Sequence, residues 1–332
     1  MKKRVFRAFL IFLSVVTLLS STLLFGCGKK KKEIIIYTSV EDFQIEHIQK
    51  RMKEQFPNLN VVLEYKSSGD HAAQLKAAGK DAACHISHNL EYGYAEELAA
   101  AGIFASLEGV IDYSIYTDDV VKSNFFAPEL RNGGAVIVNL DVLAEKGLAE
   151  PTCYEDLLDP KYKNLISMPN PKASGTGYMF LLSRVNALGE KKAFQYFDQL
   201  SENVLSFTSS GSGPVNALVG REVAIGFGMT AHAVQEISKG ENLKILFFDE
   251  GSPYSLYGQA IIAGKETDKD VVEVFKFLST TLTEELCEMF YPEKIYKDKN
   301  VTIENFPADI PYANMENNTP ERKADLIGKW NH

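Results

Sequence analysis

Short apolar, β-branched runs alternate with helical periodicity along the chain, and this alternation is the feature that most restricts its fold. Residues 34–37 (IIIY) predict a buried strand, and apolar residues then recur at helical spacing over 45–56 before Pro57. A second strand is expected over 60–65 and a second helix over 71–78. Strands that alternate with helices form βαβ units around a parallel sheet, so we predict an α/β fold.

The same alternation continues to the end of the chain. Further strands are expected at 83–87, 134–139, 165–168 and 223–227, an extended segment at 247–263, and helices at 92–101, 271–290 and 321–330. The length is sufficient for two lobes, each with a core of its own.

Two Ser/Gly-rich turns, 174–177 (SGTG) and 209–214 (SSGSGP), fall where helices are expected to begin. Glycine lets the backbone approach a ligand, Ser and Thr add hydroxyl donors, and the first turn of a helix has unpaired N–H groups. Pro214 suits the first helical position. The same residues also serve as ordinary helix caps. The occurrence of two such turns favours a site for an anion.

Ligands of open α/β sheets lie beyond the carboxyl ends of the strands, where loops lead into helices. Residues 38–39 follow the first expected strand, 67–70 follow the second, and both Ser/Gly turns occupy equivalent positions. We therefore expect these four turns to border a single ligand-binding cleft. These turns supply the candidate ligand-binding residues Thr38, Ser39, Ser68, Gly69, Ser174, Gly175, Thr176, Gly177, Ser210, Gly211 and Ser212.

The N-terminus has the pattern of an export signal. Basic residues between Lys2 and Arg7 precede an apolar or small stretch over 8–25, and Cys27 follows Gly26. The Leu-x-Gly-Cys ending resembles the bacterial lipobox, which predicts a signal peptide over 1–26, a lipid on Cys27 and a tether over 27–33. A retained membrane span is the alternative for a stretch of this length.

Charge and cysteine content exclude several classes of partner. Residues 1–26 carry four positive charges and no negative ones, so their removal takes the formal net charge from −9 to −13. This argues against nucleic acid and means that an anion must be held by local dipoles. Cys84, Cys153 and Cys287 are too few and too widely spaced for a disulfide framework. Cys84, His85 and His88 lack a fourth ligand, so we expect no metal site there.

Five segments, in this order, resemble the extracellular solute-binding lipoproteins of bacterial ABC importers. The resemblance is to the branch of these lipoproteins that binds ferric ion, 2-aminoethylphosphonate, sugar phosphates and thiamine. The segments are 37–42 (YTSVED), 157–163 (LLDPKYK), 168–178 (MPNPKASGTGY), 209–214 (SSGSGP) and 250–254 (EGSPY).

The resemblance implies a two-lobed type II periplasmic-binding-protein fold with a hinge and an interlobe cleft. It implies a discontinuous lobe 1 that comprises residues 34–133 and about 255–332, and a lobe 2 that comprises residues 134–254, with hinge strands at both ends of lobe 2. The C-terminal tail can extend over both lobes. The expected protein is a monomer without a cofactor, anchored at the outer face of the cytoplasmic membrane. It captures a small anionic solute by closure and delivers it to the transmembrane subunits of a permease.

The residues discriminate among the ligands of this branch. Ferric-ion binders normally continue the strand at 223–227 into two adjacent tyrosines, whereas this chain has GMTAHA at 228–233 and no Tyr-Tyr pair, which disfavours iron(III). The loop at 37–44 resembles the aminoethylphosphonate group. That ligand requires hydroxyl donors opposite a carboxylate, and the candidate acids are Glu41, Asp42, Glu91 and, with preference, Glu250.

Sugar phosphates are the main alternative ligands, because they would use the same turns. His232, Asn89 and Glu250 would then contact the sugar hydroxyls, and Tyr37 or Tyr254 would stack on a ring. Thr230, just after the strand at 223–227, completes the candidate set.

A surface-anchored hydrolase is a less favoured alternative. The chain has no Gly-x-Ser-x-Gly elbow, no P-loop Gly-Lys-Ser/Thr and no His-Glu-x-x-His. We therefore predict a binding protein rather than an enzyme. A receptor that signals to a membrane kinase would have the same sequence features.

Overall fold

The computed structural model describes residues 31–332 apart from 118–119, 121, 293–294 and 298–300. The predicted signal peptide at 1–26 and the predicted lipidation site Cys27 lie outside the described residues. Glu33–His332 form one compact unit. In the described part of the chain, no helix combines the length and the apolar character that crossing a membrane requires.

Three strand–helix units build what we call the first lobe. They are β1 (Lys32–Thr38) with α2 (Asp42–Gln55), β2 (Leu59–Tyr65) with α3 (Ser68–Ala78), and β3 (Ile86–Glu91) with α4 (Tyr92–Ala100). The strand order is β2-β1-β3, and β1 and β3 are parallel. This confirms the predicted α/β character of the first half of the chain.

Helix α2 illustrates how the sequence sets these elements. The backbone N–H of Glu41 donates to the side-chain Oε1 of Gln44 over 3.1 Å, which anchors the helix start. Ile48 and Met52, four residues apart, are buried on one face. The helix ends at Gln55, just before Pro57.

The second lobe contains the remaining short strands and their helices. Strands β5 (Ile166–Pro169), β6 (Val204–Thr208), β7 (Ile225–Met229) and β8 (Leu243–Leu246) are accompanied by α5 (Leu140–Glu145), α6 (Gly175–Leu188), α7 (Glu190–Ser201), α8 (Gly213–Val219) and α9 (Thr230–Ser238). β5 pairs in parallel with both β6 and β7. Helices α6 and α8 begin at the two Ser/Gly turns, as the sequence predicts.

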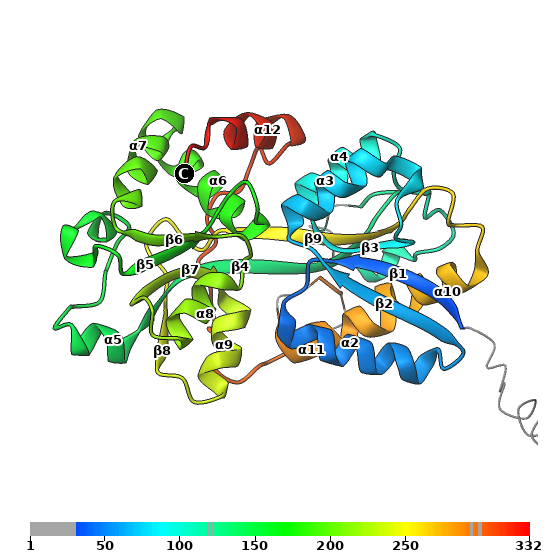
Figure 1. Ribbon diagram of the computed structural model, residues 1–332, viewed down its shortest axis with the longest axis horizontal. Helices are drawn as coiled ribbons and strands as arrows, with labels where there is room; N and C mark the ends of the chain where they lie inside the picture. Colours follow the sequence, from blue (N-terminus) through cyan, green and yellow to red (C-terminus); the bar gives the residue numbers. More distant parts are fainter. Residues whose placement is uncertain (1–30, 118–119, 121, 293–294, 298–300) are drawn as a thin grey trace, which may run out of the picture. The chain divides into compact units, whose positions relative to one another are not determined.

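Two long strands, β4 (Ala127–Asn139) and β9 (Tyr254–Ile261), connect the lobes (Figure 1). Residues 127–133 of β4 pair with β9, whereas residues 134–139 pair with β7 and β8. β9 is antiparallel to β3 and to β4, so the sheet is mixed rather than wholly parallel. An added Cβ at Gly134 would lie 2.6 Å from Met179 Cε and 2.8 Å from Phe180 Cζ, so α6 packs closely against β4 at this glycine.

The C-terminal segment divides between the two lobes. Helices α10 (Lys269–Phe277) and α11 (Thr283–Phe290), joined by a π-helical turn at Leu278–Leu282, pack in the core of the first lobe. Helix α12 (Pro320–Lys329) brings Leu326 and Trp330 into the core of the second lobe. Residues 255–332, predicted mainly for lobe 1, thus contribute to both cores.

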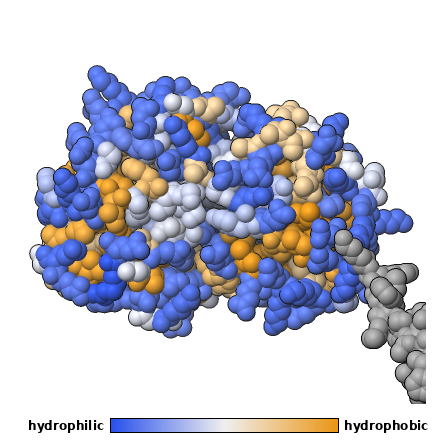
Figure 2. All heavy atoms as spheres, in the orientation of Figure 1, coloured by the Kyte–Doolittle hydropathy of each residue, from blue (hydrophilic) through white to orange (hydrophobic). Residues whose placement is uncertain are grey.

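Short helical turns complete the described elements. These are η1 (Gly79–Asp81), η2 (Tyr113–Ile115), η3 (Glu155–Leu158) and η4 (Pro160–Tyr162). The face drawn in Figure 2 is mainly hydrophilic, with apolar residues in separate patches over both lobes. The large apolar side chains instead form separate buried clusters in the two lobes.

Candidate functional site

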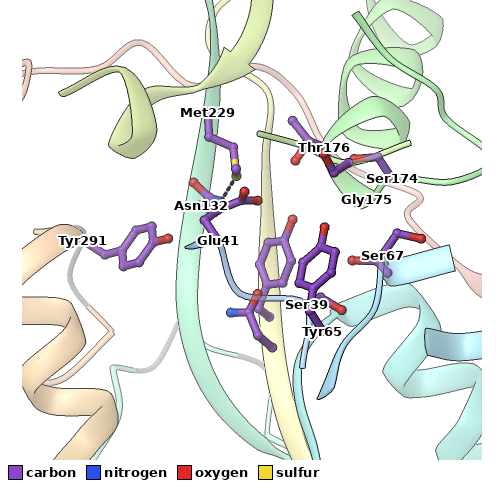
Figure 3. Close-up of a pocket in the computed structure, with 15 residues that line it drawn as sticks. Ser39, Glu41, Tyr65, Ser67, Asn132, Ser174, Gly175, Thr176, Met229 and Tyr291 are labelled. Atoms are coloured by element: carbon purple, nitrogen blue, oxygen red, sulfur yellow. Dashed lines mark hydrogen bonds between the residues drawn. The ribbon is translucent and has the colours of Figure 1, made fainter. Parts of the chain in front are cut away.

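A polar cavity of about 360 Å³, measured with its open mouth, lies between the lobes (Figure 3). The first lobe contributes the ends of β1, β2 and β3 together with the start of α3, and the second lobe contributes the two Ser/Gly turns. The lining residues are Ser39, Glu41, Tyr65, Ser67, Ser68, Asn89, Asn132, Ser174, Gly175, Thr176, Ser210, Gly211, Met229, Tyr257 and Tyr291. Among these described residues none is Lys or Arg, and Glu41 is the only acid.

The structure brings nine of the eighteen predicted ligand-binding residues to this cavity. They are Ser39, Glu41, Ser68, Asn89, Ser174, Gly175, Thr176, Ser210 and Gly211. Two helices begin at its wall, because α3 starts at Ser68 and α6 at Gly175. Ser67 and Ser174 accept from the N–H groups of Asp70 and Gly177, each over 3.4 Å, so they are helix caps as well as lining residues.

Glu41 is the acid of this cavity. It is 7% exposed, and its Oε2 atom has no hydrogen-bond partner among the described residues. Burial penalises the charged form and raises the pKa of Glu41 to about 7, although a hydrogen bond from the Ser212 side chain acts in the opposite direction. A carboxyl group that titrates near neutrality is sensitive to a cationic ligand.

Asn132 provides a second unsatisfied acceptor. Its Nδ2 atom donates to Met229 Sδ over 2.7 Å, the bond drawn dashed in Figure 3. In that orientation Oδ1 is left buried and without a hydrogen-bond partner within the described structure. Buried polar atoms are normally paired, so Asn132 Oδ1 and Glu41 Oε2 together indicate a missing donor.

Three tyrosines from different elements also line the cavity: Tyr65 at the end of β2, Tyr257 in β9, and Tyr291 after α11. Burial raises the pKa of all three, that of Tyr65 to about 12. The phenols therefore remain protonated at neutral pH and act as hydrogen-bond donors. Tyr291 already donates to Gln44 Oε1 over 3.2 Å.

Two of the predicted acids have structural partners instead of facing the cavity, which corrects the preference for Glu250. Glu250 forms an ion pair with the fully buried Arg184. Glu91 is itself fully buried and forms an ion pair with Lys323 of α12. Lys323, assisted by hydrogen bonds, keeps the pKa of Glu91 below its usual range despite burial. Neither carboxylate is left for a ligand.

Asp42 and Ser212 line a neighbouring cavity of about 830 Å³, which shares Tyr65, Ser67 and Ser210 with the first. His232, which we considered as a contact for sugar hydroxyls, lines a third cavity of about 650 Å³ that also includes Asp42 and Ser212. Burial lowers its pKa to about 4, so it is neutral at physiological pH.

The remaining predicted residues have packing roles. The Gly69 N–H donates to Ala173 O over 3.1 Å, and a Cβ at Gly177 would lie 2.4 Å from Pro169 O. Thr230 is buried as the first residue of α9. Two aromatic residues that we considered for ring stacking also lie elsewhere. The Tyr254 ring lies 5.3 Å from the Arg131 guanidinium, and the Tyr37 ring contacts His71 edge-on at 6.0 Å.

Thr38 belongs to a buried array below the cavity. Its Oγ1 atom is 2.9 Å from His88 Nδ1, and His88 Nε2 is 3.2 Å from Glu129 Oε1. Glu129 also accepts from the backbone and side chain of Asn89 over 2.8 and 2.7 Å. These residue types occur in catalytic triads, but Thr38, His88 and Glu129 are 0% exposed, so no substrate reaches them here.

Metal and thiol chemistry find little support elsewhere in the described residues. No group of three or more His, Cys, Asp and Glu side chains in that part of the chain is arranged to hold a metal ion. Cys84, Cys153 and Cys287 form no disulfide in the described part of the chain. Burial raises the pKa of Cys84 to about 12, which makes it an unreactive thiol.

The sequence analysis did not anticipate five of the lining residues: Tyr65, Asn132, Met229, Tyr257 and Tyr291. Ser67 belongs to the predicted turn at 67–70 but was not among the candidate residues. Tyr65 and Met229 are the last residues of β2 and β7, where the rule used for the turns would have found them. Asn132 and Tyr257 lie within the two strands that connect the lobes, and Tyr291 follows α11, so no local motif marks them.

Two α/β lobes that share two long strands and enclose a polar cavity define a two-lobed binding protein of type II. Residues 132–332 match the bacterial extracellular solute-binding proteins, and the chain belongs to this family. Proteins of this family function outside the cytoplasm and deliver small solutes to ABC permeases, and they are transport proteins rather than enzymes.

Relatives and solved structures extend this assignment. The chain is 24% identical to an uncharacterized protein of Haemophilus influenzae over 92% of this chain and 91% of that protein. It is 24% identical over 56% of both chains to a Salmonella typhimurium protein named "Putative 2-aminoethylphosphonate-binding periplasmic protein". The periplasmic binding protein AfuA from Actinobacillus pleuropneumoniae, solved with fructose-6-phosphate, has the same fold, with TM-score 0.79, 20% identity, and coverage of 91% of this chain and 98% of AfuA.

Proposed function

We propose that this protein captures a small phosphonate or phosphorylated solute for an ABC importer, with a 2-aminoethylphosphonate-like solute as the favoured ligand. One observation carries the proposal. The same cavity combines hydroxyl donors and two helix N-termini with two acceptors, Glu41 Oε2 and Asn132 Oδ1, that have no hydrogen-bond partner among the described residues. A solute with an anion at one end and an ammonium group at the other satisfies both sets.

The anionic end would be held by dipoles alone. Helices α3 and α6 begin at the cavity, where their first N–H groups and partial positive charge favour an anion. Hydroxyls of Ser68 from the first lobe and of Thr176 and Ser210 from the second also line the cavity, and Ser210 Oγ lies 3.1 Å from Ser212 Oγ. No Lys or Arg side chain lies among the described lining residues, so the anion would be bound without a formal counter-charge.

The ammonium end would be held by Glu41 and Asn132. A cation beside Glu41 stabilises the ionised carboxylate and so lowers its pKa from about 7. Asn132 Oδ1 then accepts a second hydrogen bond from the same ammonium group.

Closure of the two lobes would be the mechanism. Ser39 and Glu41 come from the first lobe and Thr176 and Ser210 from the second, so one bound solute contacts both. Such contacts shift the population of the protein toward the closed form, which a permease would then recognise. We further propose that a lipid on Cys27 holds a monomeric protein at the outer face of the cytoplasmic membrane, on the strength of the lipobox-like sequence.

Two alternatives rest on specific observations. A sugar phosphate would use the same hydroxyls and helix N-termini, and its sugar hydroxyls would donate to Asn132 and Glu41. Iron(III) would use Tyr65, Tyr257, Tyr291 and Glu41, because it prefers anionic oxygen ligands. The raised pKa values of the tyrosines oppose the loss of the phenol protons that iron binding requires.

A thermal-shift screen of the full chain tests the proposal. The solutes are 2-aminoethylphosphonate, inorganic phosphate, fructose 6-phosphate, thiamine, a polyamine and iron(III). We expect the largest rise in melting temperature with 2-aminoethylphosphonate. A rise confined to iron(III) or the polyamine would overturn the proposal, whereas the largest rise with fructose 6-phosphate would favour the first alternative.

A further inference from the structure

A buried histidine lies behind the cavity and contacts two serines. His71, in the first turn of α3, is 0% exposed. Its Nδ1 atom is 3.0 Å from Ser39 Oγ, and its Nε2 atom is 3.0 Å from Ser87 Oγ. Ser39 lines the cavity, whereas Ser87 is a fully buried residue of β3. The histidine therefore connects a ligand-facing hydroxyl to the interior.

A neutral histidine has one donor nitrogen and one acceptor nitrogen, so only two arrangements are possible. Burial lowers the pKa of His71 to about 3, which leaves the ring neutral. If Nε2 carries the proton, Ser39 donates to His71 and presents only lone pairs to the cavity. If Nδ1 carries it, His71 donates to Ser39, whose own O–H is then directed to the ligand.

Ser87 distinguishes the two arrangements. Its hydroxyl is fully buried, and His71 Nε2 is its only hydrogen-bond partner among the described residues. A buried O–H group requires an acceptor, and this requirement is met only if Ser87 donates to Nε2. The remaining proton of the ring is then on Nδ1, and it is donated to Ser39.

We infer that His71 is a positioning residue that holds the Nδ1–H tautomer and thereby makes Ser39 a hydrogen-bond donor toward the anionic group of the ligand. This inference rests on the proposed function, because it assigns Ser39 to the phosphonate or phosphate end. In this arrangement the ring engages one lone pair of Ser39 and leaves its O–H free to donate to the ligand.

The tautomer is measured directly on the ligand-free full chain. With ¹⁵N-labelled histidine, a long-range ¹H–¹⁵N spectrum distinguishes a protonated Nδ1 with a bare Nε2 from the reverse. We expect the first pattern for His71, and its assignment is made with the Ser87→Ala variant, which perturbs Nε2. The reverse pattern would overturn the inference. Because this readout needs no ligand, it decides the inference even if no solute binds, an outcome that would contradict only the proposed function.

Isosteric substitutions provide the binding test with 2-aminoethylphosphonate. In His71→Asn the amide lies near the former Nδ1 and retains a donor for Ser39, whereas His71→Gln places its amide near Nε2. We expect His71→Gln and Ser39→Ala each to weaken binding about ten- to a hundred-fold, the effect of one lost hydrogen bond to a charged group. His71→Asn is expected to retain most of the affinity.

A double-mutant cycle separates this role from a merely structural one. If His71 acts through Ser39, His71→Gln has little further effect in the Ser39→Ala background. Fully additive losses, or equal losses for His71→Asn and His71→Gln, would overturn the inference. Melting temperatures of the ligand-free variants identify any general loss of stability.

Discussion

The backbone N–H of Gly69 donates to the carbonyl oxygen of Ala173 over 3.1 Å, which joins the first turn of α3 to the loop before α6. This bond links the first lobe to the second beside the cavity. The two lobes therefore meet at this point, where a glycine permits the close approach of two backbones. A Cβ at position 69 would lie 2.7 Å from Lys172 O.

The Gly69→Ala variant is expected to bind solute more weakly without losing stability. The added methyl group meets backbone atoms only when the lobes approach, and overpacking of this kind costs about 1–3 kcal/mol, which corresponds to roughly five- to a hundred-fold in Kd. Calorimetry with 2-aminoethylphosphonate and melting of the ligand-free protein measure the two effects. Gly328→Ala, where an added Cβ meets no atom within 4 Å, is the matched control. Equal affinity of both variants would show that closure does not use this contact.

Replacement of Glu41 by Gln is expected to discriminate between the two ends of the ligand. The variant loses the negative charge opposite the ammonium group, so 2-aminoethylphosphonate should bind about ten- to a hundred-fold more weakly. Inorganic phosphate, which lacks an ammonium group, should bind at least as tightly as before. Asp42→Asn, at the neighbouring cavity, serves as the control for the change in charge. If both solutes lose affinity equally, Glu41 does not recognise the amine.

The stability of the ligand-free protein is expected to fall as the pH rises toward neutrality. Burial raises the pKa of Glu41 from 4.5 to about 7, so the folded state binds this proton more tightly than the unfolded state. The contribution is complete below pH 4.5 and is lost as the pH rises through about 7. It amounts to about 3 kcal/mol at most. Urea unfolding at several pH values should show this decline, and Glu41→Gln should remove it.

Binding of an ammonium-bearing solute is expected to show the opposite pH dependence. The solute requires ionised Glu41, so affinity should increase with pH up to about 7, with proton release on binding below that value. Calorimetry in buffers of different ionisation enthalpy measures the protons released. Because a phosphonate also titrates, the difference between wild type and Glu41→Gln isolates the contribution of the protein. Identical profiles for the two would contradict the assignment.

The ion pair between Glu91 and Lys323 is expected to support stability rather than ligand affinity. Lys323→Met leaves Glu91 buried without a counter-charge, a change that typically costs about 3–5 kcal/mol. The double variant Glu91→Gln with Lys323→Met should recover most of the loss. Urea unfolding measures stability. An unchanged unfolding free energy for Lys323→Met would show that the pair is not formed in solution.

The sequence predicted the parts of the site that depend on local chemistry. Ser174 and Thr176 reach the cavity because a capping serine and a Gly-rich first turn determine where α6 begins. The sequence predicted less well which of the acidic residues face the cavity. Glu250 and Glu91 have the same local character as Glu41, and their partners Arg184 and Lys323 are remote in sequence. The choice among the acids therefore depended on tertiary packing, which no local pattern encodes.

The strand β4, which connects the two lobes, was also predicted only in part from the sequence. The apolar run at 134–139 predicted the second half of β4, but the strand begins at Ala127, because residues 127–133 pair with β9. Charged and polar residues such as Glu129 and Asn132 interrupt the strand pattern there. Both are buried: Glu129 accepts hydrogen bonds from Asn89 of β3, and Asn132 lines the cavity. These polar residues interrupt the apolar alternation, so the sequence pattern does not reveal the first half of the strand.

Calorimetric titration of the full chain with 2-aminoethylphosphonate and with inorganic phosphate, for wild type and Glu41→Gln, tests the central claim most directly. We predict one saturable site in the wild type that prefers 2-aminoethylphosphonate, and the loss of that preference in the variant. Absence of binding by both solutes, or a preference that Glu41→Gln leaves unchanged, would contradict the account.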